Sequence, residues 1–175
     1  GSGGINSAEI VDEVLALAKN DKVKALVLRV NSPGGSAYGS EQMWEALETF
    51  KKTGKPFVVS MGDYAASGGY YISSGAQRIF ADKFTITGSI GIFGLIPNVN
   101  GLLKKLGLNP QMVATNPDAM FPNMFYPLTD RQLEAMQQMV QNGYELFVKR
   151  CADGRHTTVA KIEQIADGRP LAASV

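Results

Sequence analysis

A serine in a run of small residues is the strongest candidate for chemistry in this sequence. Ser67 follows two alanines and precedes two glycines, in the run Ala-Ala-Ser-Gly-Gly. Because these neighbours carry little side-chain bulk, a substrate carbonyl can reach the hydroxyl, which can then act as a nucleophile. We therefore take Ser67 as a candidate nucleophile for acyl transfer.

A second turn of small residues occupies residues 31–36, where a proline is followed by Gly34 and Gly35. The backbone amides of this turn and those from Gly68 onward, at the start of a predicted helix, can converge on the oxyanion of an acyl-transfer intermediate. Nucleophile and oxyanion hole would then come from separate loops. The alternative is that both segments are only tight turns, which glycine content alone does not exclude.

Other polar residues are weaker candidates. His156, the only histidine, would be the base of a serine, histidine and acid triad, but it lies in a polar stretch between Arg155 and Thr157 that is typical of a surface. No spacing of histidine, cysteine and carboxylate residues predicts a metal site. The glycines lack the Lys-Ser or Lys-Thr that completes a phosphate-binding loop. We expect neither a metal nor a cofactor.

Composition indicates one ordinary globular domain. The chain has 175 residues, 45% hydrophobic and 19% charged, and its formal net charge of +1 does not indicate nucleic acid as a partner. The single cysteine, Cys151, has no partner for an internal disulfide and is expected to pack in the core. No apolar run reaches the roughly 18 to 20 residues that cross a bilayer. Residues 1–4 are typical of a cloning scar or linker, which leaves residues 5–175 as one domain.

Hydrophobic periodicity predicts the elements that hold both turns. Buried strands at residues 22–30 and 57–61 run into the two glycine-rich turns. Further strands are predicted at residues 78–81, 85–94 and 111–114, and helices at residues 7–19 (capped by Ser7), 40–52 (ended by Gly54), 99–106, from Thr129 onward, and from Thr157 or Thr158 to about Gly168. This alternation predicts an α/β fold with a mainly parallel sheet, in which working residues follow the carboxyl ends of strands.

The stretch of residues 116–127 holds three prolines with methionine and phenylalanine between them. Proline interrupts both helices and central strands, so we predict an irregular loop here. Its apolar character indicates a surface that a partner covers. The alternative is an ordinary hydrophobic loop.

Three ordered motifs resemble the signal peptide peptidase A family, also called protease IV. They are Asn-Ser-Pro-Gly-Gly at residues 31–35, Ala-Ala-Ser-Gly-Gly-Tyr at residues 65–70 and Thr-Gly-Ser-Ile-Gly at residues 87–91. The first is shared with the wider group of Clp-protease and crotonase folds, whereas the other two point to the peptidase branch. The resemblance runs from about Ser7 to Gly168 and implies a Clp-protease/crotonase-like fold built from repeated strand-turn-helix units.

Carried over residue by residue, the resemblance implies that Ser67 is the nucleophile and that Gly35 and Gly68 donate the oxyanion-hole amides. Ser89 is then a hydroxyl that orients the general base, which in this family is a lysine. The matching segment, residues 113–121, contains no lysine. Lys83 is ambiguous, and the other lysines fall on polar helix faces or at helix ends, where a solvated charge is the simpler interpretation.

Longer members of the family resemble two tandem copies of the fold, with the lysine in the amino-terminal copy and the serine in the carboxyl-terminal one. This chain resembles the second copy, so the resemblance implies a homo-oligomer whose base comes from the absent amino-terminal half, and little activity for the fragment alone. The implied reaction is hydrolysis of short hydrophobic peptides such as cleaved signal peptides. The implied location is the bacterial cytoplasmic (inner) membrane, facing the periplasm, through a segment absent from this soluble fragment.

Two other functions stay open at the level of the sequence. A crotonase-type acyl-coenzyme A enzyme would hold a thioester enolate with paired backbone amides, but it would not need the serine motif. A non-catalytic assembly domain would keep the fold for subunit packing, and the missing lysine permits this.

Overall fold

The computed structural model describes residues 4–116, 118–119 and 121–174. The predicted scar at residues 1–4 therefore lies outside the described residues except for Gly4. The chain divides into two compact units, the first formed by the residues up to Ile92 and from Gly143 on, and the second by Phe93–Asn142. The prediction of a single domain over residues 5–175 did not anticipate this division and stays a prediction.

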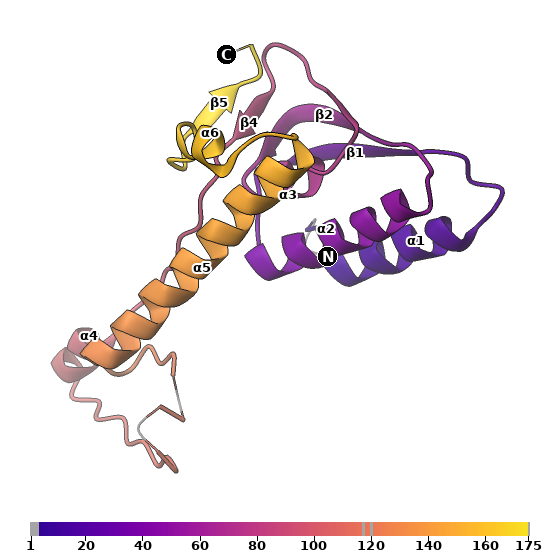
Figure 1. The fold of residues 1–175 in the computed structure, drawn as a ribbon. Helices are drawn as coiled ribbons and strands as arrows, with labels where there is room; N and C mark the ends of the chain where they lie inside the picture. Colours follow the sequence, from indigo (N-terminus) through magenta and orange to yellow (C-terminus); the bar gives the residue numbers. More distant parts are fainter. Residues whose placement is uncertain (1–3, 117, 120, 175) are drawn as a thin grey trace. The chain divides into compact units, whose positions relative to one another are not determined.

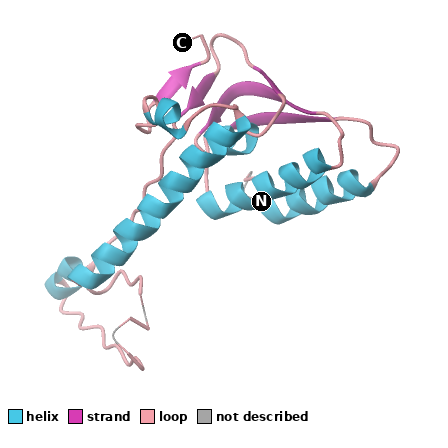
Figure 2. Cartoon of the chain, viewed as in Figure 1, coloured by secondary structure: helices cyan, strands magenta, loops and turns pink. Residues whose placement is uncertain are grey.

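Five strands of the first unit form one mixed sheet. They are β1 (Leu26–Ser32), β2 (Phe57–Ala66), β3 (Arg78–Phe80), β4 (Ile86–Gly88) and β5 (Pro170–Ala172). The long strand β2 pairs in parallel with β1, β3 and β4, and β5 runs antiparallel to β4. Figure 2 shows these strands joined by helical crossovers. The predicted α/β class with a mainly parallel sheet is confirmed.

Two amphipathic helices, α1 (Ser7–Lys19) and α2 (Ala37–Lys52), pack against each other and against this sheet (Figure 1). The cap of α1 is Asn6 rather than Ser7, because the Asn6 side chain accepts from the Ala8 N–H at 3.1 Å. Helix α2 begins before residue 40, where it was predicted to start, because Ser36 caps it by accepting from the Gly39 N–H at 3.2 Å.

Two groups of buried side chains form the core of the first unit. One lies between the sheet and helices α1 and α2 and includes Phe50, Phe57 and Val59, all fully buried. The other includes Phe147 and Cys151 of helix α5 (Asp130–Gly154). Cys151 is free and fully buried, and burial raises the pKa of its thiol to about 12. The expectation that this cysteine packs in the core is confirmed.

Some predicted strand bounds were wrong. The strand predicted at residues 22–30 begins only at Leu26, and of residues 85–94 only Ile86–Gly88 are extended and paired. Residues 111–114, predicted as a possible strand, have no regular structure. Their isolated apolar run finds no neighbouring strand, and a strand needs one to satisfy its backbone groups.

The second unit contains α4 (Asn100–Lys105) and the start of α5. Thr129 and Gln132 form a reciprocal cap at that start: the Thr129 hydroxyl accepts from the Gln132 N–H at 3.3 Å, and the Gln132 side chain accepts from the Thr129 N–H at 3.1 Å. Between these helices, the described residues of the predicted loop at 116–127 form neither helix nor strand. Pro117, one of the three prolines, lies outside the described residues. In the part of the chain that the structure describes, no helix combines the length and apolar character needed to cross a membrane.

Candidate active site

The candidate residues follow strands β1, β2 and β4 at one edge of the sheet. Pairing of Ser32 with Ala65 and of Ala66 with Gly88 brings the ends of these parallel strands together. The Gly34-Gly35 turn therefore follows β1, Ser67 follows β2 and Ser89 follows β4. The structure thus gathers the predicted nucleophile, oxyanion turn and base-orienting serine at the edge where parallel sheets place their working residues.

Ser67 has an unusual backbone conformation, with φ of 50° and ψ of −119°. Non-glycine residues rarely adopt positive φ, and such strain costs roughly 1–3 kcal/mol and occurs most often at functional sites. Two hydrogen bonds hold the turn: the Ser67 N–H donates to the Gly88 carbonyl at 2.9 Å, and the Ser67 carbonyl accepts from the Tyr71 N–H at 2.8 Å. Helix α3 (Gly68–Ser73) starts directly afterwards. This sharp strand-to-helix turn is the kind that presents a nucleophilic serine to substrate.

The two glycine-rich turns pack directly against each other. A Cβ atom placed on Gly34, where φ is +117°, would lie 2.7 Å from the Ser67 Cβ and 3.1 Å from its Oγ. A Cβ on Gly68 would lie 3.3 Å from the Gly35 nitrogen and only 2.5 Å from the Ser40 Oγ. Only residues without side chains allow this approach, so the glycines bring the Gly35 amide, Gly68 and the Ser67 hydroxyl to one place.

Ser89 is linked to the same edge through its own backbone and side chain. It also has positive φ, 50°. Its hydroxyl donates to the Gly168 carbonyl and its N–H to the Arg169 carbonyl, both at 2.9 Å. A hydroxyl that donates its one proton still has lone pairs to accept from another group. That arrangement is compatible with holding the amine of a base, and the role of Ser89 stays a prediction.

The lysines of this chain point to other partners or to solvent. Lys51 and Lys55 are half-buried, and their ammonium groups donate to Gly75 and to Ala18 carbonyls at 3.0 and 2.8 Å. The remaining lysines are exposed. Lys83, the ambiguous one, is among them, with its ammonium 4.8 Å from the centre of the Phe84 ring. Exposure keeps a lysine charged, which makes it a poor base.

His156 is exposed, at the turn that follows α5, where its N–H donates to the Asp153 carbonyl at 3.3 Å. This is the polar surface position that its sequence neighbours predicted. Nothing in these contacts connects His156 with Ser67.

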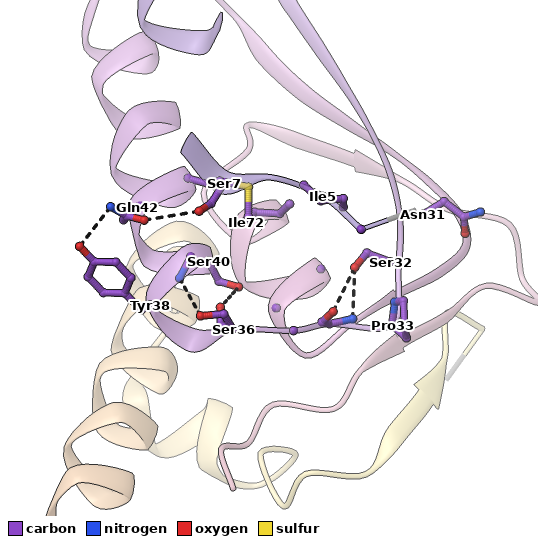
Figure 3. A pocket seen from close by; sticks show the side chains of 17 residues that line it. Ile5, Ser7, Asn31, Ser32, Pro33, Ser36, Tyr38, Ser40, Gln42 and Ile72 are labelled. Atoms are coloured by element: carbon purple, nitrogen blue, oxygen red, sulfur yellow. Dashed lines mark hydrogen bonds between the residues drawn. The ribbon is translucent and has the colours of Figure 1, made fainter. Parts of the chain in front are cut away.

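A pocket of about 510 Å³ opens beside the two turns (Figure 3). Gly35 and Gly68 contribute to its wall together with Ser32, Ser36 and Ser40. The Ser32 hydroxyl accepts from the Gly34 N–H at 3.2 Å, and the Ser40 hydroxyl donates to the Ser36 carbonyl at 2.9 Å. Sequence reasoning missed Ser40, because its place against Gly68 follows only from the packing of α3 on α2.

Comparison with known proteins agrees with this geometry. The model of peptidase family S49 matches residues 49–174, and that of the Clp protease family matches residues 5–83. The structure of a ClpP1 mutant from Listeria monocytogenes superimposes with a TM-score of 0.57 over 95% of this chain and 75% of that one. At 14% sequence identity this likeness shows the fold alone.

Curated relatives are considerably longer than this chain. Protease 4 of Haemophilus influenzae is 41% identical over 92% of this chain, which covers 26% of that protein. Protease 4 of Salmonella typhi is 42% identical over 95% of this chain and 27% of its own length. For the putative signal peptide peptidase SppA of Enterococcus faecium, the values are 34%, 94% and 48%. Because the S49 family model spans well over half of the sequence, including Ser67 and Ser89, the chain belongs to peptidase family S49.

Proposed function

We propose that this chain carries the nucleophile and the oxyanion hole of a serine endopeptidase. The observation that carries the proposal is the convergence of Ser67 with the Gly34-Gly35 turn and Gly68 at the end of β2, in a chain that belongs to a peptidase family. The Ser67 Oγ attacks the scissile carbonyl while a base takes its proton. The carbonyl oxygen becomes an oxyanion, which accepts from the Gly35 and Gly68 amides.

The intermediate then collapses in two steps. The C–N bond breaks, the amine leaves with the proton from the base, and an ester to Ser67 remains. Water, deprotonated by the same base, attacks this ester and releases the peptide acid. Loss of one oxyanion donor typically lowers kcat by about 10²–10³-fold.

We further propose that the base is a lysine supplied by a part of the longer protein that this chain does not include, with Ser89 orienting it. A lysine is neutral near physiological pH only if it is buried, and the lysines described above are exposed or bonded elsewhere. The chain spans about a quarter of the two Protease 4 sequences, which leaves ample length for the base. A base from a neighbouring copy implies a homo-oligomer, and by itself this chain would turn over little or no substrate.

The proposed substrates are short hydrophobic peptides such as the remnants of cleaved signal peptides. The name of the Enterococcus faecium relative, a putative signal peptide peptidase, supports this class. We propose that the full-length protein works at the bacterial inner membrane, with this part facing the periplasm and the anchor in another segment. No nucleic acid takes part.

The test is hydrolysis of an apolar fluorogenic peptide amide by the full-length protein. Ser67→Ala should abolish turnover and also abolish covalent labelling by a fluorophosphonate. Ser60→Ala, which removes another half-buried hydroxyl of β2, is the matched control and should leave both intact. Unchanged turnover in Ser67→Ala would refute the assignment. A wild-type protein that neither turns over peptide nor takes the label would favour the non-catalytic assembly domain.

A further inference from the structure

A buried polar network connects the three helices around the candidate nucleophile. Glu41 of α2 accepts from the Tyr71 hydroxyl at 2.5 Å and from the Arg150 guanidinium through both of its carboxylate oxygens. The guanidinium carbon of Arg150 lies 3.9 Å from the centre of the Trp44 ring. The Tyr71 ring packs on Phe147, with 4.5 Å between ring centres. One carboxylate thus joins α2, α3 and α5.

Helix α3 needs such a tether because it has only six residues. Isolated helices of fewer than about 12–15 residues are marginal in water, so packing and side-chain bonds must fix the direction of α3. Tyr71 is the residue through which α3 is held: it is 4% exposed, and burial together with the bond to Glu41 raises the pKa of its hydroxyl. The hydroxyl therefore stays protonated and keeps donating.

Tyr71 also reaches the nucleophile through its backbone. Its N–H donates to the Ser67 carbonyl at 2.8 Å, so the position of Tyr71 sets that of the Ser67 turn. On the other side, Glu41 directly follows Ser40, whose hydroxyl limits the approach of Gly68. The network therefore links α2, which follows the Gly35 turn, to α3, which follows Ser67.

We propose that Glu41 and Arg150 are positioning residues for catalysis: by holding the Tyr71 hydroxyl they set the Ser67 turn and the Gly68 amide against the Gly35 turn. This inference rests on the proposed peptidase function. Neither residue touches substrate. Their effect is on the separation of the two amides that receive the oxyanion, which matters more in the transition state than for substrate binding.

Two mild substitutions test the network in the full-length protein. Glu41→Gln keeps the size and an acceptor for Tyr71 but loses the charge that holds Arg150. Tyr71→Phe keeps the ring on Phe147 but loses the hydroxyl. Because a misplacement of about 1 Å can cost up to 10²-fold in rate, we expect kcat per folded molecule to fall roughly 10-fold in each variant with KM little changed. The double variant should fall no further than the lower single one, since both changes break the same link.

Glu48→Gln is the matched control. Glu48 lies on the same helix, its side chain is 19% exposed against 21% for Glu41, and it pairs with Lys51 of that helix rather than with α3 or α5. Its kcat should equal that of the wild type. Folded protein is counted by circular dichroism and by the end point of fluorophosphonate labelling.

The outcomes separate this inference from the function on which it rests. If Ser67→Ala retains turnover, the peptidase assignment fails and the inference with it. If Ser67→Ala is inactive while Glu41→Gln and Tyr71→Phe match Glu48→Gln in kcat, only the positioning role is overturned. A lowered unfolding midpoint with normal kcat likewise overturns it, because the network would then serve stability alone. Should Glu41→Gln fail to fold, Tyr71→Phe decides.

Discussion

Replacing Gly34 by alanine tests the close packing of the two turns directly. The new Cβ would lie 2.7 Å from the Ser67 Cβ, 3.1 Å from the Ser67 Oγ and 3.2 Å from the Ala66 carbonyl oxygen. Carbon atoms in contact normally stand about 3.5–4.0 Å apart, so the substitution forces a shift of close to an ångström. The backbone adds a second cost, because φ at this position is +117°.

The two costs can be estimated separately. Overpacking costs about 1–3 kcal/mol, and an alanine at positive φ costs about 1–2 kcal/mol. We therefore expect Gly34→Ala to lower the free energy of unfolding by roughly 2–5 kcal/mol, which corresponds to a fall in Tm of about 4–20 °C for a chain of this size.

Thermal unfolding followed by circular dichroism measures this, with two other glycines as controls. Gly54→Ala has φ of +81° but open space around the new Cβ, so it carries the backbone cost alone. Gly35→Ala has neither a positive φ nor a neighbour within 4 Å and should unfold close to the wild type. A Tm for Gly34→Ala within about 2 °C of that for Gly54→Ala would mean that the turns are not in contact, and would refute the geometry of the site.

Two further predictions concern stability. Glycine at position 67 should relieve the strain of φ 50°, so Ser67→Gly should be more stable than Ser67→Ala by about 1–3 kcal/mol in urea unfolding, although both lack the nucleophile; equal stability would show that the turn is unstrained. Burial raises the pKa of both the Tyr70 hydroxyl and the Cys151 thiol to about 12. In the unfolded chain these groups ionise near their ordinary values of about 10 and 8.5, so the stability they contribute is complete below pH about 8.5 and is lost as pH rises toward 12. Urea unfolding between pH 7 and 10.5 should show this decline, and Cys151→Ala should reduce it; a decline of equal size in that variant would contradict the assignment to the thiol.

Much of the fold and the centre of the site could be predicted from local sequence. Buried strands that run into glycine-rich turns predicted both loops, and the small neighbours of Ser67 marked it as a reachable hydroxyl. These signals are local, because hydrophobic periodicity and turn chemistry act over a few residues. The ends of the elements were less accurate: Asn6 and Ser36 cap α1 and α2 where Ser7 and residue 40 were expected.

Only the tertiary structure decided which of these residues meet. Strand β5 has three residues and begins with Pro170, too short for any periodicity, and it exists because β4 offers a free edge. Glu41 and Arg150 are 109 positions apart, and nothing local to either residue indicates a partner. The sequence by itself determined that Ser67 stands at an open turn. Packing of α3 between α2 and α5 decided how closely Gly34, Gly35 and Gly68 surround it, because such distances depend on side chains from every part of the first unit.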